Sequence, residues 1–107
     1  ATSAHEQLLS AMGSCMAVGF VLNATKRGIA IHDFEIVMEG SFDNIRKWAG
    51  VEDSGNPGYG GITAKAFVSA DADASVLQEI WDLAVEGSPV TQTVKRGTTV
   101  TAEFEAV

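Results

Sequence analysis

A single cysteine, Cys15, is the side chain in this sequence that is best suited to redox or nucleophilic chemistry. A thiol attacks a peroxide as its thiolate, which a nearby cation or the amino terminus of a helix must stabilise. A lone cysteine in a core is also compatible with no chemistry at all, because it packs as a small apolar side chain. Both interpretations of Cys15 stay open on the residues alone.

No basic side chain has a sequence spacing that singles it out as the partner of Cys15. Any activating cation would therefore arrive through the fold or from a second subunit. The candidates are His5, His32, Arg46, Lys47, Lys65, Lys95 and Arg96. A helix start would not replace such a cation, because Cys15 is expected roughly two to three turns inside its helix, where the dipole has little effect.

Other groups of reactive residues are weaker candidates. The two histidines, His5 and His32, are far apart in the sequence, and a metal site needs several converging ligands, so we expect no metal. The glycine-rich residues 58–61 precede a predicted strand rather than a helix, so they form no phosphate cradle. Ser14 has no base at a recognisable spacing. We therefore expect no cofactor.

Cys15 is at the centre of an apolar stretch, residues 8–22, in which the only polar side chains are those of Ser10 and Ser14. A surface helix would show a recurring polar face, so this stretch predicts a helix that is buried on all sides. It is shorter than the roughly 20 apolar residues of a membrane span. We therefore predict a central core helix from about Glu6 to Lys26.

The residues at both ends of this helix fit its predicted boundaries. Ser3 and Glu6 have the spacing of a capping box, in which the serine accepts a hydrogen bond from the backbone three residues on. Gly28 follows two cations, which suit the carboxyl end of a helix, and glycine is the usual residue just past such an end.

The rest of the chain alternates between strand and helix patterns. The predicted elements are strands at 29–42, 62–69 and 100–106, a glycine- and proline-rich loop at 43–61, and helices at 76–86 and from Ser88-Pro89 to about Val94. The first two strands should pair antiparallel. Trp48 and Trp81 fit anchors of a core or an interface better than stacking platforms for a ligand.

This order of elements predicts an α+β domain with helices on one side of an antiparallel sheet. A chain of 107 residues with 46% hydrophobic content is long enough for one core, so residues 1–107 form a single domain. One sheet face and one neighbouring helix cannot cover a helix that is apolar on all sides. We therefore expect the central helix to be buried against a second copy of the chain, in a homodimer.

The charge balance is acidic, with 7 Lys and Arg against 14 Asp and Glu and a net charge of −7. A nucleic acid or an anionic membrane surface binds clustered cations, so neither is expected as a partner. One cysteine excludes a disulfide within the chain, and no signal-peptide pattern is present, so we expect a cytoplasmic protein. The chain begins with Ala1 rather than Met, from which we expect that it starts partway along a longer protein.

Two sequence motifs carry a resemblance to a known family. Residues 6–17, EQLLSAMGSCMA, are followed by a predicted strand ending Met38-Glu39-Gly40, and residues 86–94 read EGSPVTQTV. In this order they resemble the OsmC/Ohr family of osmotically inducible and organic-hydroperoxide-resistance proteins. The resemblance implies an intertwined homodimer whose two central helices cross, and it places this chain in the carboxy-terminal portion of the usual family fold.

The resemblance also implies roles for individual residues. Cys15 corresponds to the cysteine that attacks a hydroperoxide, and Glu6 resembles the glutamate that activates it. Ser88 stands at the position of the resolving cysteine, so an external thiol would have to reduce the oxidised Cys15. The family's activating arginine lies in amino-terminal strands that this chain does not contain.

The implied activity is a thiol-dependent peroxidase that reduces organic or small hydroperoxides in oxidative-stress defence. The alternative is a non-catalytic dimer of the same fold that binds a small apolar molecule near Cys15. The two classes differ in whether the thiol reacts with a hydroperoxide faster than a free thiol does.

Overall fold

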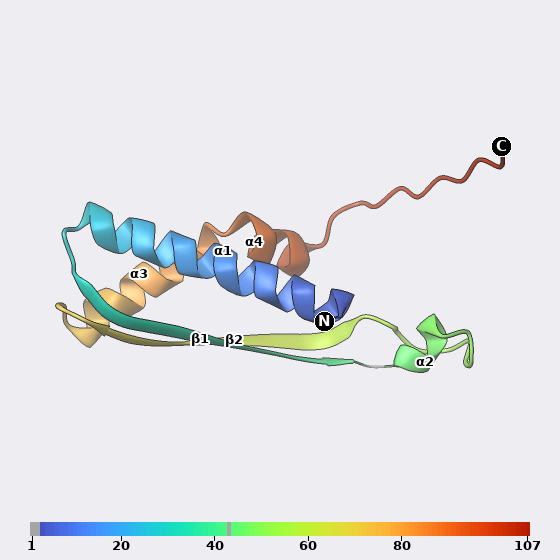
Figure 1. The fold of residues 1–107 in the computed structure, drawn as a ribbon, viewed down its shortest axis with the longest axis horizontal. Helices are drawn as coiled ribbons and strands as arrows, with labels where there is room; N and C mark the ends of the chain where they lie inside the picture. The colour runs from blue at the N-terminus through green and yellow to red at the C-terminus, as the bar shows by residue number, and fades with distance from the viewer. Residues whose placement is uncertain (1–2, 43) are drawn as a thin grey trace.

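The structure is a computed structural model that describes residues 3–42 and 44–107, so Asp43, the first residue of the predicted loop, lies outside the described residues. Its elements are α1 (Ala4–Lys26), β1 (Ile31–Phe42), α2 (Ile45–Trp48), β2 (Tyr59–Ala70), α3 (Ala74–Glu86) and α4 (Pro89–Arg96). Figure 1 shows α1 running along one face of the β1–β2 sheet, with α3 and α4 packed beside it. The α+β class and the placement of the helices are as predicted.

Helix α1 ends at Lys26 as predicted and begins at Ala4, two residues before the predicted Glu6. The Ser3 side chain accepts a hydrogen bond of 3.2 Å from the backbone N–H of Glu6, which caps the amino end. Arg27 ends the helix, and Gly28 follows with a φ of 69°, a left-handed conformation that glycine adopts without strain.

The prediction that α1 is buried on all sides is wrong within a single chain. Its buried residues share one face and are Met12, Gly13, Met16, Phe20 and Ala24. The opposite side remains exposed, with Val18 at 59% and Leu22 at 56% of full exposure. The helix is apolar on two faces, and this chain covers one of them. A second subunit on the other face stays a prediction.

By length and composition alone, α1 could also cross a membrane, with a mean hydropathy of 1.5 over its best 18-residue window. Core helices of soluble proteins pass the same test, and here α1 packs on β1, α3 and α4. The feature is therefore weak evidence for a membrane span.

The two long strands form an antiparallel pair with the predicted alternation. Ile36 lies opposite Ala66 and Val37 opposite Lys65 in the register. Phe34, Ile36 and Met38 are half-buried beneath α1, whereas the residues between them are exposed. Residue 40 has to be a glycine, because a Cβ there would clash with the ring of Tyr59.

The final strand predicted at 100–106 is wrong for this chain. Residues 97–107 form no strand and extend away from the body as a tail (Figure 1). Val100 is 81% exposed and Phe104 is 91% exposed. An alternating pattern becomes a strand only where a neighbouring strand supplies hydrogen bonds, and in the described sheet β1 and β2 pair only with each other.

The loop before β2 also departs from its prediction, because Asn44 caps a four-residue helix, α2, within it. The Asn44 side chain accepts from the backbone of Arg46 at 3.1 Å. Trp48, at the end of α2, is 74% exposed and so anchors no core in the described chain. Trp81 on α3 is half-buried and does pack against the core.

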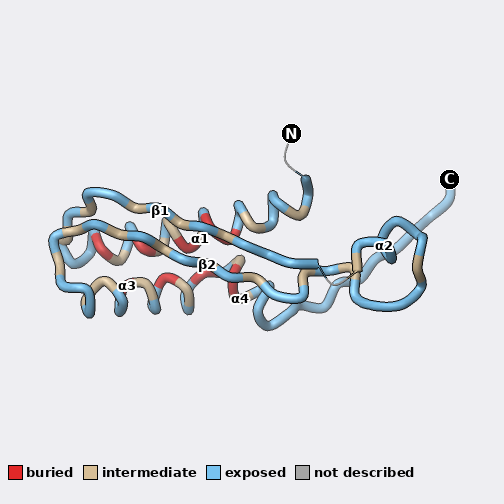
Figure 2. The backbone as a smooth tube through the Cα atoms, turned by 90° about the horizontal axis from the view of Figure 1, so that it is seen from below, coloured by how far each residue is buried: buried red, intermediate tan, exposed pale blue. Residues whose placement is uncertain are grey.

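The core lies between α1, α3 and the sheet. Phe20 and Ala24 of α1 meet Ile80 and Ala84 of α3, all four at 2% exposure or less. The ring centroids of Phe20 and Phe34 are 5.1 Å apart, which joins the helix layer to β1. Figure 2 shows buried stretches, in red, on both α1 and α3.

Candidate functional site

An open groove of about 520 Å³ lies between α1 and the junction of α3 with α4. Its lining residues are Ser14, Cys15, Val18, Gly19, Leu22, Asn23 and Lys26 of α1, and Leu83, Ala84, Gly87, Ser88 and Pro89 from the α3–α4 region. The α1 residues recur at intervals of three and four, so they form one face of the helix. This face extends from the edge of the core face, at Gly19, to the exposed side of the helix, at Val18 and Leu22.

The floor of the groove is formed where α1 and α3 approach most closely. A Cβ on Gly19 would lie 3.5 Å from the Cα of Ala84, which is ordinary van der Waals contact. Small residues at both positions allow the two helices to pack closely below the groove.

Cys15 is half-buried and lies on the wall of this groove. Its thiol is therefore neither sealed in the core nor fully exposed on a loop. Among the described residues, none makes a hydrogen bond or ion pair with its sulfur. The structure thus gives Cys15 access to a ligand but shows no polar partner for it within the chain.

Ser88 lines the same groove, so the structure brings together the two positions that the sequence singled out as a pair. Ser88 is 3% exposed and is the amino-terminal cap of α4. Its hydroxyl oxygen accepts from the backbone N–H of Thr91 at 3.2 Å and donates to Thr91 Oγ1 at 2.9 Å. Ser88 therefore has a structural role at this position, because it caps a helix that has a proline in its first turn.

Glu6 is not brought to the groove. It lies nine residues before Cys15 on α1, which places the two side chains on opposite sides of the helix and roughly 13 Å apart along its axis. Glu6 is exposed in the first turn of α1, where its charge suits the helix dipole.

The cations considered at the sequence level also lie elsewhere. The seven candidates are absent from the groove lining among the described residues. His32 pairs with Asp71 at 2.6 Å, and Arg46 pairs with Glu52 at 3.2 Å. The ring of His5 packs edge-on against Phe42, with centroids 4.6 Å apart. These contacts hold three of the candidates away from the thiol.

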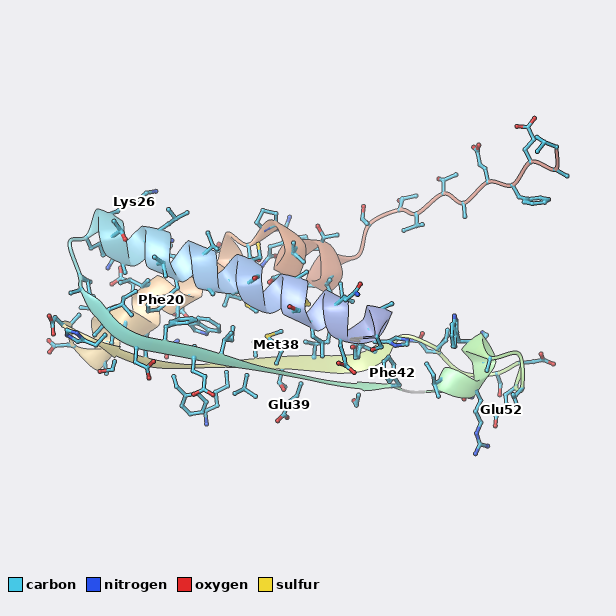
Figure 3. The ribbon with its side chains drawn as sticks, in the orientation of Figure 1. Phe20, Lys26, Met38, Glu39, Phe42 and Glu52 are labelled. Atoms are coloured by element: carbon cyan, nitrogen blue, oxygen red, sulfur yellow. The ribbon has the colours of Figure 1, made fainter. Side chains whose placement is uncertain are left out.

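Lys26 is the one charged side chain among the described residues that line the groove, and the sequence reasoning did not select it. Its place at the end of α1, on the side away from the sheet, is visible in Figure 3. The signal that could have found it is its spacing of eleven residues from Cys15, which is about three helical turns and returns to the same face.

In the described part of the chain, no group of three or more His, Cys, Asp or Glu side chains is placed to hold a metal ion. The groove itself contains no such set. Its chemistry is that of a thiol, an ammonium group and apolar walls.

Comparison with known proteins adds a family and a fold. A family model described as "OsmC-like protein" matches residues 1–103. No curated protein matches the chain. Among solved structures, the chain is similar to an OsmC-like protein of unknown function from Vibrio cholerae O1 biovar eltor, with a TM-score of 0.70 and 16% sequence identity. The similarity covers 86% of this chain and 58% of that one, so the chain spans less than two thirds of its relative's length.

Proposed function

The chain belongs to the OsmC-like protein family, and from this premise we propose that it is a thiol-dependent peroxidase that reduces organic or small hydroperoxides through Cys15. The observation that carries the proposal is the half-buried thiol on the wall of an open, largely apolar groove. A fully buried cysteine would support the inert interpretation instead. The apolar walls suit the carbon skeleton of an organic hydroperoxide.

The reaction that we propose uses the thiolate of Cys15 as the nucleophile. Its sulfur attacks the outer oxygen of the hydroperoxide, the O–O bond breaks, and the alkoxide takes up a proton to leave as an alcohol. Cys15 is thereby oxidised to the sulfenic acid, and the hydroperoxide is reduced. One sulfur–oxygen bond forms for each oxygen–oxygen bond that breaks.

Regeneration requires a thiol from outside the chain, because Cys15 is the single cysteine and Ser88 occupies the other position. An external low-molecular-weight thiol condenses with the sulfenic acid, releasing water and forming a mixed disulfide. A second such thiol attacks the mixed disulfide, restores the Cys15 thiol and leaves with the first as a disulfide. These steps suit a reducing, cytoplasmic environment, which we propose for this protein.

A homodimer is part of the same proposal. The uncovered face of α1 presents Val18, Val21 and Leu22, each at least 45% exposed. A second copy packed on this face would remove that apolar surface from water. It would also bring side chains of the partner to the groove, where a cation of the partner could contact Cys15. Light scattering tests this part, and a stable monomer would contradict it.

A second candidate is a non-catalytic binder of a small apolar molecule in the same groove. The observation that favours it is the absence of a basic contact to the Cys15 sulfur among the described residues. A thiol whose thiolate form is not stabilised is expected to react no faster than a free thiol. In this case the groove would serve the ligand and the cysteine would be a lining residue.

The experiment that separates the two measures sulfenic acid formation at Cys15 by cumene hydroperoxide under pseudo-first-order conditions. The comparison is a free thiol at the same pH, and Cys15→Ser is the control for the site of oxidation. The peroxidase proposal expects a rate at least about a hundredfold above that of the free thiol, which is a typical contribution of a positioned catalytic group. A rate equal to that of the free thiol favours the binder.

A further inference from the structure

We draw no further inference here: the strongest candidate, the apolar surface that the exposed side chains of Trp48 and Val51 present at the α2 end of the β1–β2 hairpin, carries no proposal, because nothing in the structure shows what covers it.

Discussion

Helix α1 has two apolar faces with different surroundings. One face places Phe20 and Ala24 against α3 and the sheet, where both side chains are completely buried. The other face places Cys15, Val18 and Leu22 on an open groove. Both faces carry apolar residues at the same helical spacing, so hydrophobicity alone does not distinguish them. One face of α1 therefore packs in the core of the chain, and the other is exposed and can bind a ligand or a second copy of the chain.

The first prediction concerns the reactivity of the open face. Cys15→Ser replaces the thiol with a hydroxyl of similar size, so hydroperoxide-dependent oxidation of the protein should be lost completely. Because Cys15 is half-buried on the groove rather than in the core, the free energy of unfolding should fall by less than about 1 kcal/mol. Mass spectrometry after cumene hydroperoxide treatment and urea denaturation measure the two effects. Retention of the oxidised species in the variant would place the reactive site elsewhere, for example on a methionine.

The second prediction compares the stability contributed by the two faces. Phe20→Ala should lower the free energy of unfolding by about 3 to 5 kcal/mol, because it leaves a cavity between α1, α3 and β1. Val18→Ala removes apolar atoms that are already 59% exposed and should cost less than about 1 kcal/mol in the monomer.

Urea denaturation of both variants at several protein concentrations measures this contrast. A concentration-dependent loss of stability in Val18→Ala would show that a second copy covers the groove face. Equal and concentration-independent losses in the two variants would contradict the division of α1 into a core face and an open face.

Much of the fold follows from patterns within single segments. The Ser3 cap, the alternation of Phe34, Ile36 and Met38, and the helix restart at Ser88-Pro89 depend on neighbours within a few residues. Such local rules carry enough information to place the helix ends approximately and to predict which residues of a strand share a face. The sequence therefore predicted the elements from α1 to α4, apart from the four-residue helix α2.

The remaining errors concern relations between distant segments. The alternation at 100–106 is a correct strand pattern, but it has no neighbouring strand in the described chain to pair with. Nothing in the apolar stretch around Cys15 shows which of its faces α3 covers. The spacing of Lys26 places it on the same helix face as Cys15, but that this face borders a groove depends on the positions of Leu83 and Ser88, which come from another part of the chain.

The third prediction concerns Ser88, the residue that caps the amino end of α4 and lines the groove. Ser88→Ala removes the side chain that caps this helix, so the free energy of unfolding should fall by about 1 kcal/mol. Ser88→Gly should cost less than that, because glycine is tolerated at a cap position. Thermal denaturation measures both variants. An unchanged melting temperature in Ser88→Ala would show that the buried hydroxyl contributes nothing to the start of α4.

A cysteine at position 88 tests whether residues 15 and 88 lie close enough to form a disulfide. Ser88→Cys places a second thiol on the groove that already holds Cys15, at the cost of the cap. If the sulfenic acid forms at Cys15, the new thiol should condense with it to give a disulfide and water, which non-reducing mass spectrometry detects as a loss of two hydrogens after peroxide treatment and tryptic digestion. The two tryptic peptides would then be joined. A persistent sulfenic acid in this variant would show that the two positions, although on one groove, do not approach within bonding distance.

The smallest effect is expected from a substitution of Glu6, which lies on neither the core face nor the groove face of α1. Its carboxylate is exposed in the first turn of α1, on the side of the helix opposite Cys15. Glu6→Gln should therefore leave the rate of Cys15 oxidation unchanged within about twofold, while the loss of a favourable charge near the helix start should lower the free energy of unfolding by only about 0.3 to 1 kcal/mol. Stopped-flow oxidation and urea denaturation measure the two quantities. A tenfold lower rate would mean that a Glu6 carboxylate reaches the thiol from a second copy of the chain, because no rotation of the side chain spans roughly 13 Å around its own helix.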